Sequence, residues 1–432
     1  MTDASRSIVF VTDELFLPKP HNGSAEVYVR TAQDYARQGY DVFCISFFRD
    51  PRRAAAPDVV ESYASLFSGF LLLPGWNGGG TPLGQLSLAW REMSRWATGN
   101  IFAKNRLLAA LLRPHLDTVV RFVHEHDIGT VFFHKPHTVL LFADILPRLK
   151  SARLIVDLHD DFVERELHYR GAYGSFFAAL PAAEIARNYW QPYLRQRCSR
   201  IDPVRSRTIE SGLLAQCDQV LFSSRQEYER YLARPPLDGK LVHRQRRFVG
   251  GGPLARAAEA APFDAGFIGS DDVMNLDALL WFCRNILPAV CRQRPDFRFL
   301  VAGSIGRRAE RLLRNLDAVT IWGSLDDVKS FYQAIEMLVV PLRYGTGTST
   351  KVHEALAFGW PIVSTTVGVR GIPEEELTGV TVADRPDAFA AGVIEQLIAR
   401  KSAARSADAD ASFAGVVPSR GMSIATAAVC EG

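Results

Sequence analysis

The sequence lacks several features that mark particular protein classes. Its six cysteines are scattered without a Cys-x-x-Cys pair, which argues against a disulfide framework or a zinc site and fits a reducing compartment. Lys and Arg number 50 against 47 Asp and Glu, so nothing indicates nucleic-acid binding, which needs a strongly basic face. Apolar runs such as residues 67–74 fall far short of the ~20 residues of a membrane-spanning helix. The N-terminus has acidic residues and no long apolar core, so we expect no signal peptide and a cytoplasmic location.

Length and periodicity predict an α/β protein of two domains. At 432 residues the chain exceeds what one hydrophobic core usually supports. Residues 7–12 and 41–48 are apolar runs typical of buried strands, and a helical pattern over 25–38 lies between them and ends at Gly39. This strand–helix–strand order indicates a parallel sheet. Further strands of the first half are expected at 130–133, 153–156 and 219–223.

A second series of alternating elements starts near residue 264. Strands are expected at 265–268, 297–302, 319–322, 337–341 and 361–364, and a helix over 276–294. The segment 233–262 is rich in Pro, Gly, Arg and Ala and is interpreted as a linker. We therefore predict two doubly wound, Rossmann-like domains that face a cleft, over residues 1–240 and 255–402, followed by a weakly ordered tail over 403–432.

The most informative segment is PLRYGTGTSTKVHEALAFGWPIVSTTVGVRGI, residues 341–372. A strand ends at Pro341, a glycine-containing loop follows, and a helix over 350–358 stops at Gly359. Glycines allow close approach to a ligand, and the first N–H groups of a helix can bind a phosphate or sugar oxygen. Lys351 on the first turn can neutralise a diphosphate, and Glu354 can accept hydrogen bonds from ribose hydroxyls.

This segment resembles the nucleotide-sugar signature of family-4-type retaining glycosyltransferases, the glycosyl transferases group 1. Residues 354–363, EALAFGWPIV, match the second part of that signature. Thr346 stands where the signature has its first glutamate, and the loop PLR-x-G-x-G-x-x-x-K fits another form used in this group. The resemblance implies a GT-B fold and a nucleotide-sugar donor. It also implies that four loop residues face the sugar and diphosphate: Gly345, Thr346, Gly347 and Thr348.

Upstream pieces of the second half resemble the same family. Gly269 and Ser270, followed by Asn275, are similar to a glycine turn near the donor diphosphate. Gly323 follows Trp322 in a strand end that borders the nucleobase in the family. Each short piece is also compatible with an ordinary buried strand and a tight turn, and their order ahead of Glu354 favours the family interpretation.

The first half resembles the family more weakly. Asn22 and Gly23 follow the first strand, where GT-B enzymes often have a loop close to the donor phosphate. His159 and Asp160 follow another strand and resemble the family's His-Asp motif, in which the histidine faces the transferred sugar. We predict His159, Asp160 and Lys351 as catalytic residues. Asp160 and Asp161 are equally compatible with helix caps, and residues 134–137 are a weaker candidate.

The mechanism implied is transfer of the sugar with retention and without a metal. We find no Asp-x-Asp pattern with metal-ligand character, and Asp271–Asp272 and Asp326–Asp327 are interpreted as helix caps. Lys351 is the first candidate for the diphosphate, with Arg343 and Arg370 as weaker ones. The resemblance implies UDP or GDP as the nucleotide and a glycan, lipid-linked or small-molecule acceptor, as in surface polysaccharide synthesis.

A basic aromatic stretch from Trp90 to Arg113 fits the sheet pattern less well. Residues 101–116 have the pattern of an amphipathic basic helix, with Lys104, Arg106 and Arg113 on its polar side. One interpretation is a helix packed on the first domain with a solvated basic face. The other is peripheral contact with the inner face of a membrane or with the acceptor.

Three alternatives remain open at this point. An NAD-dependent oxidoreductase has a similar fold class, but no G-x-G-x-x-G follows the first strand with an acidic residue about 20 positions on. A GT-B nucleotide-sugar epimerase would turn over without an acceptor. A non-enzymatic, degenerate GT-B binding or scaffold subunit is favoured by Thr346 and by the atypical C-terminus.

Overall fold

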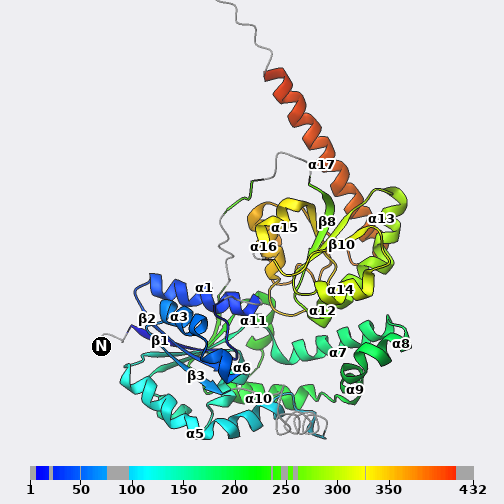
Figure 1. Ribbon diagram of the computed structural model, residues 1–432. Coiled ribbons are helices and arrows are strands. Elements are labelled where there is room, and N and C mark those ends of the chain that lie inside the picture. The colour runs from blue at the N-terminus through cyan, green and yellow to red at the C-terminus, as the bar shows by residue number, and fades with distance from the viewer. Residues whose placement is uncertain are drawn as a thin grey trace, which may run out of the picture.

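The computed structural model describes residues 6–18, 23–48, 50–74, 97–234, 237–244, 252–255, 261–325 and 327–414. They form two α/β domains, each with a parallel sheet between helices (Figure 1). The predicted pair of doubly wound sheets is confirmed. Among the described residues no helix is long and apolar enough to cross a membrane.

The first sheet has seven strands in the order β3-β2-β1-β4-β5-β6-β7, all parallel. The strands are β1 (Ser7–Val11), β2 (Asp41–Phe48), β3 (Gly69–Pro74), β4 (Thr130–His134), β5 (Arg153–Leu158), β6 (Gln219–Phe222) and β7 (Leu241–His243). The helices are α1 (Gly23–Arg37), α2 (Pro51–Ala54), α3 (Pro57–Leu66), α5 (Ala103–Glu125), α6 (Pro136–Leu141), η1 (Leu146–Leu149), α7 (Phe162–Ala178), α8 (Ala182–Glu184), η2 (Ile185–Tyr189), α9 (Trp190–Cys198), α10 (Pro203–Leu214) and α11 (Arg225–Leu232).

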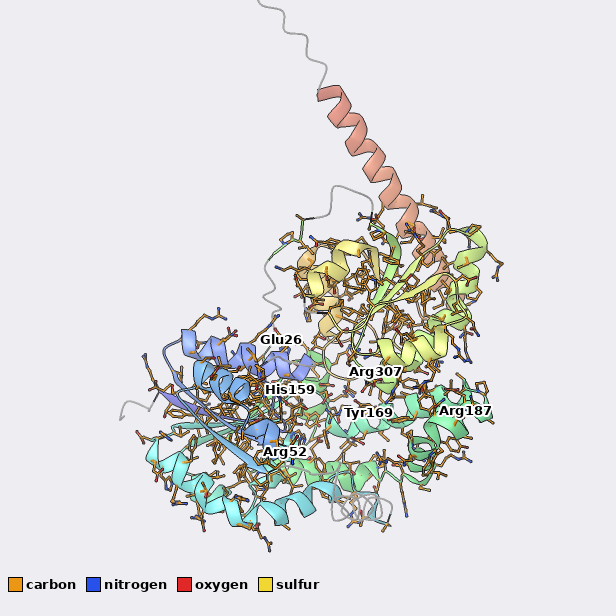
Figure 2. All side chains as sticks on the ribbon, viewed as in Figure 1. Glu26, Arg52, His159, Tyr169, Arg187 and Arg307 are labelled. Carbon is orange, nitrogen blue, oxygen red and sulfur yellow. The ribbon has the colours of Figure 1, made fainter. Side chains whose placement is uncertain are left out.

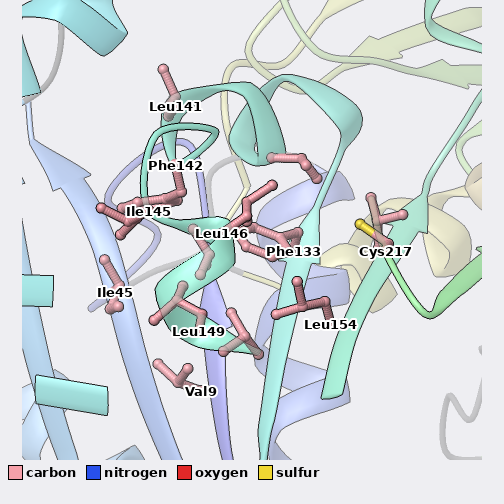
Figure 3. Packing of buried hydrophobic residues seen from close by; sticks show 14 of the residues in the cluster. Val9, Ile45, Phe133, Leu141, Phe142, Ile145, Leu146, Leu149, Leu154 and Cys217 are labelled. Atoms are coloured by element: carbon pink, nitrogen blue, oxygen red, sulfur yellow. The ribbon is translucent and has the colours of Figure 1, made fainter. Parts of the chain in front are cut away.

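Apolar side chains cover both faces of this sheet, as its continuous apolar strands predict. On one face, Phe10 packs with Tyr28 of α1 and Tyr63 of α3. On the other face, Val9 and Phe133 pack against η1 and α5 (Figure 3). The burial of β1 on both sides fixes its carboxyl end at the centre of the domain.

The second sheet has six strands in the order β10-β9-β8-β11-β12-β13, again all parallel. The strands are β8 (Phe263–Ile268), β9 (Phe299–Ala302), β10 (Val319–Ile321), β11 (Ile335–Val340), β12 (Ile362–Ser364) and β13 (Val380–Val382). The helices are α12 (Val273–Trp281), η3 (Phe282–Ile286), α13 (Leu287–Gln293), α14 (Gly306–Leu313), α15 (Val328–Ala334), α16 (Thr350–Phe358), η4 (Glu374–Glu376) and α17 (Pro386–Ala414).

Helix α7 joins the two domains. It follows β5 of the first sheet and packs against α12 of the second domain. Phe176 and Phe177 near its end belong to the same buried cluster as Phe267 of β8. Tyr169 donates a hydrogen bond to Asp272 (2.5 Å), and Ser175 shares one with Tyr344 (2.6 Å). An apolar seam with polar contacts therefore holds the second domain beside the carboxyl edge of the first sheet.

Three segments differ from the sequence expectation. Strand β7 lies inside the expected linker and pairs with β6, so the first sheet continues past residue 240. The helix expected over 276–294 is α12 and α13, joined by the π-helical turn η3. Residues 403–414 of the expected tail continue helix α17, whose far end projects away from both domains (Figure 1). Residues 415–432 lie outside the described part.

Candidate functional site

Each of the two sheets has a point where its strand order reverses. The reversal lies between β1 and β4 in the first sheet and between β8 and β11 in the second. Open α/β sheets bind ligands at such points, outside the carboxyl ends of the strands. The segments that follow β4, β5, β8 and β11 contain most of the candidate residues. Figure 2 shows His159 and Glu26 near the boundary between the domains.

Lys351 is held on the first turn of α16 by groups from the start of the second domain. Its ammonium donates a hydrogen bond to Asn275 Oδ1 (2.9 Å) and lies 4.5 Å from the centre of the Phe267 ring. Asn275 in turn donates to the carbonyl and hydroxyl oxygens of Ser270 (3.1 and 3.2 Å). Three residues predicted for the donor site are thus brought together. Burial, and then the charge of Arg370, lower the pKa of Lys351 to about 7.

Glu354 lies one turn further along α16 and accepts a hydrogen bond from the buried Tyr332 hydroxyl (3.1 Å). Burial raises the pKa of Glu354 to about 7. The charges of Arg30 and Glu26 on α1 also act on this carboxyl, so α1 of the first domain lies near it. At the N-terminus of α16, the buried Ser349 hydroxyl at the N-cap position makes no capping hydrogen bond and has no partner among the described residues.

Glycine turns lie at the ends of three neighbouring strands of the second sheet. The Gly303 N–H donates to the Gly323 carbonyl (3.0 Å), and a Cβ on Gly303 would lie 2.3 Å from the Gly269 carbonyl oxygen. Gly303 has a φ of 99°, which glycine adopts without strain. Gly269 and Gly323 were predicted from the sequence, and Gly303, which joins them, was not.

His159 follows β5, and its ring is mostly buried. Its Nε2 is hydrogen-bonded to Nδ1 of His134 (3.0 Å), and Asp157 Oδ2 lies 3.9 Å from the same nitrogen. These three residues are the one group among the described residues whose ligand atoms lie close enough to hold a metal ion, within 4.8 Å of one another. If the protein does use a metal ion, contrary to expectation, these three residues are the group to examine.

A second polar cluster lies beside His134 and combines Lys135 and His137 of the weaker candidate segment with Asp13, which was not predicted. Asp13 follows β1 and accepts hydrogen bonds from Tyr28 (2.8 Å), Lys135 (3.0 Å) and His137 (3.1 Å). Lys135 has a φ of 73°, an uncommon conformation for a residue other than glycine. Although burial opposes its ionisation, the charge of Lys135 and the hydrogen bonds hold the pKa of Asp13 well below its usual range. The sequence showed only its position after a strand.

Three hydrogen bonds link residues 345–348, which we call the donor loop, to the first domain. Thr346 donates to Asp160 Oδ2 (3.2 Å), and Asp160 Oδ1 pairs with Arg165 (3.2 Å). The Gly345 N–H donates to His168 Nδ1 (2.9 Å), and the Gly347 N–H donates to Glu227 Oε1 (2.8 Å). Two of the N–H groups expected to face the donor are therefore bonded to first-domain side chains here. His168 and Glu227 were not predicted for the site, because only the domain arrangement places them at the loop.

The remaining basic candidates hold the loop or a neighbouring helix. Arg370 donates to the carbonyl oxygens of Thr346 (2.8 Å) and Val367 (2.9 Å), and its guanidinium lies against Gly345. Arg343 forms a two-point ion pair with the buried Asp277 (2.5 and 3.1 Å). These partners give Arg343 a structural role.

Several other expectations have plain outcomes. Asp161, Asp272 and Asp327 cap helices α7, α12 and α15, as expected for caps, whereas Asp160 does not. Gly23 is the first residue of α1, and Asn22 lies outside the described residues.

The basic stretch from Trp90 to Arg113 is described only in part. Residues 90–96 and the side chains of Lys104 and Arg106 lie outside the described part. Arg113 is exposed on α5 and pairs with Asp144 (3.3 Å). Leu112 and Leu116 on the same helix are buried in the core of the first domain. From Leu112 onward, the apolar face of this helix therefore covers the sheet.

Comparison with known proteins agrees with this geometry. The family described as glycosyl transferases group 1 matches residues 262–398, which make up the second domain. No curated protein matches the sequence.

Three solved structures illustrate the similarity of fold. Sucrose-phosphate synthase from Thermosynechococcus elongatus is 20% identical, with a TM-score of 0.58 over 91% of this chain and 90% of that one. HepE from Anabaena in complex with UDP-glucose is 12% identical, with a TM-score of 0.54 over 90% and 89%. The lipopolysaccharide outer core galactosyltransferase WaaB is 12% identical, with a TM-score of 0.50 over 91% of both chains.

The two sheets, their facing edges and these structural matches define a GT-B fold. Within this fold, the second domain is the part that matches the group 1 glycosyltransferases.

Proposed function

We propose that this protein transfers a sugar from a UDP- or GDP-sugar to a glycan, lipid-linked or small-molecule acceptor, with retention and without a metal ion. The observation that carries the proposal is the placement of Lys351 and Glu354 one turn apart at the start of α16, whose N-cap side chain makes no capping hydrogen bond. A cation and helix N–H groups suit a diphosphate, and a carboxylate suits the hydroxyls of a ribose.

The second domain holds the donor in this proposal. Glu354 accepts hydrogen bonds from the ribose, and Lys351 neutralises the diphosphate as it leaves. Gly269, Ser270, Asn275 and Gly323 line the diphosphate and base, and the loop from Gly345 to Thr348 lies along the sugar. Preorganised positive groups of this kind stabilise the charge that develops on a leaving group. The bound UDP-glucose named for HepE supports a UDP-sugar among the two donor classes.

The first domain holds the acceptor. His159 and Asp160 lie at the carboxyl end of β5, next to the donor loop, and act on the transferred sugar. In a retaining transfer the acceptor attacks the face from which the nucleotide leaves. The name of the galactosyltransferase WaaB supports a role in surface polysaccharide synthesis.

The proposal is tested by calorimetric titration with UDP-glucose, UDP-galactose, UDP-N-acetylglucosamine and GDP-mannose, each beside its free nucleoside diphosphate. We expect one base to bind with both its diphosphate and its sugar nucleotide. The absence of binding to every compound would refute the proposal. Conversion of a bound sugar nucleotide without any acceptor would instead establish an epimerase, and binding without turnover over a broad acceptor panel would establish a binding subunit.

A further inference from the structure

At position 346 the proposed donor site lacks a carboxylate. The signature that this loop resembles has a glutamate there, and this chain has a threonine. The Thr346 hydroxyl donates its hydrogen to Asp160, and its carbonyl accepts from Arg370, so both groups are already engaged. A sugar ring presents several hydroxyls, and their hydrogen bonds to a carboxylate are stronger than those to neutral acceptors.

The carboxylate of Glu227, on α11 of the first domain, lies beside this loop. Ser224 is the N-cap of α11 and accepts from the Glu227 N–H (3.4 Å), so the pair has the spacing of a capping box. In a capping box the glutamate side chain turns back to the N-cap residue. Here, Glu227 Oε1 instead accepts from the Gly347 N–H (2.8 Å), and the backbone N–H of Asp161 lies close enough to lower the pKa of the carboxyl. The side chain thus bridges the turn after β5 and the donor loop.

The other oxygen of this carboxylate has no partner. Glu227 is 1% exposed, and its Oε2 makes no hydrogen bond among the described residues. A buried acceptor without a partner destabilises the folded protein, and more so when it is charged. Burial, and then the nearby charge of Asp160, raise the pKa of Glu227 to about 7. An oxygen of this kind beside the donor loop is suited to a ligand hydroxyl.

We propose that Glu227 binds hydroxyl groups of the donor sugar, so that the first domain supplies the carboxylate that position 346 lacks. This inference rests on the proposed function. Oε1 keeps the Gly347 N–H, and Oε2 accepts from the sugar. Recognition of the sugar then depends on contact between the domains, whereas recognition of the nucleotide depends chiefly on residues of the second domain.

The test compares the affinities for UDP and UDP-glucose, and for GDP and GDP-mannose, in the wild type and in Glu227→Gln. Glutamine retains an oxygen that can accept from Gly347 and removes the charge and one acceptor. For the base that binds, we expect the Kd of the sugar nucleotide to rise at least tenfold and that of the free diphosphate to change less than twofold. Glu229→Gln is the matched control, because Glu229 lies exposed on the same helix and pairs with Arg225.

Two results would overturn the inference. Equal losses of affinity for both ligands would mean that Glu227 only supports the loop, and unchanged affinity for both would mean that it does not contribute. If the wild type binds none of the four ligands, the proposed function fails and this inference fails with it. A loss confined to the sugar nucleotide in Glu227→Gln is the supporting result.

Discussion

Lys351 and Glu354 lie on successive turns of one helix. Burial lowers the pKa of Lys351 and raises that of Glu354. The pKa of the ammonium falls to about 7 and that of the carboxyl rises to about 7. Such shifts are common where groups are placed for ligands, because the ligand's own charges and hydrogen bonds then stabilise the ionised form.

Replacing Glu354 with Ala should weaken nucleotide binding by roughly one to two powers of ten, since a charge-assisted hydrogen bond contributes ~1.5–3 kcal/mol. Calorimetry with UDP and GDP measures this. Glu354→Gln is a second variant that keeps an acceptor for the Tyr332 hydroxyl, which separates loss of ribose binding from local damage. The exposed Glu375→Ala is the control. Unchanged affinity in both Glu354 variants would rule out the assignment.

Nucleotide affinity should also fall as the pH rises above 7. The pKa of Lys351 is lowered, so its ammonium is present below pH 7 and is lost above it. If only the ammonium form binds the diphosphate, the affinity for UDP-glucose or GDP-mannose falls about tenfold per pH unit between 7 and 9. Lys351→Met should bind weakly with no such dependence. A flat profile in the wild type would show that Lys351 does not act as this cation.

The sequence could indicate Lys351 and Glu354 because loop, helix and both side chains lie within one short segment. Glu227, His168 and Asp13 could not be found in the same way. Glu227 has the spacing of an ordinary capping box, and its partner Gly347 is 120 residues away. Asp13 gains its partners only when the ends of β1 and β4 come together.

At the scale of elements, two glycines in the left-handed conformation shape the donor loop and α16: one lies in the loop and the other ends the helix. Gly347 has a φ of 67° and Gly359, the C-cap of α16, a φ of 75°. A Cβ on Gly347 would lie 2.6 Å from the His159 carbonyl oxygen, whereas a Cβ on Gly359 would meet nothing within 4 Å. The two positions thus share backbone strain and differ in the contact with the first domain.

The variants Gly347→Ala and Gly359→Ala exploit this difference. Both should lose about 1 kcal/mol of stability from the left-handed conformation. Only Gly347→Ala should also lose turnover, by roughly a hundredfold, because it forces the loop away from the turn after β5. Thermal unfolding and initial rates of sugar transfer measure the two effects. Similar turnover in both variants would mean that this contact does not matter for the reaction.

Periodicity predicted the elements whose ends are set by local signals. The bounds of β2 and α16 agree with expectation, since charged or glycine residues flank them. Strand β7 was missed because its three half-buried residues carry almost no pattern and form a strand only by pairing with β6. The turn η3 was missed because its buried residues continue the apolar pattern of a helix.

For the whole molecule, α7 determines how the domains face each other. Its apolar end lies in the buried cluster of the second domain, and Gly171 leaves room for the Tyr344 ring, 2.7 Å from where a Cβ would be. The sequence predicted two domains and a cleft, because two separate strand series are visible in it. It could not predict this seam, which depends on side-chain packing between segments far apart in the sequence.

Peripheral membrane contact remains a prediction. The structure favours electrostatic contact over insertion of the apolar face of α5. Since the apolar face of α5 from Leu112 onward is buried, contact through Lys104, Arg106 and Arg113 would be electrostatic. We expect sedimentation with anionic liposomes at low salt, its loss near 0.5 M salt, and its loss when the three residues are changed to Gln. Neutral liposomes are the control. A wild-type protein that stays in the supernatant at low salt would contradict the prediction.

The central claim is that this chain moves a sugar from a nucleotide donor without a metal ion. The most direct measurement is release of nucleoside diphosphate from the donor that binds, with an acceptor extract and excess EDTA. We predict release by the wild type, with the sugar recovered on an acceptor, and little release by Glu354→Ala or Lys351→Met. Abolition by EDTA with rescue by a divalent cation would contradict the metal-free mechanism and direct attention to His134, Asp157 and His159. No release from any sugar nucleotide, with or without metal, would contradict the account as a whole.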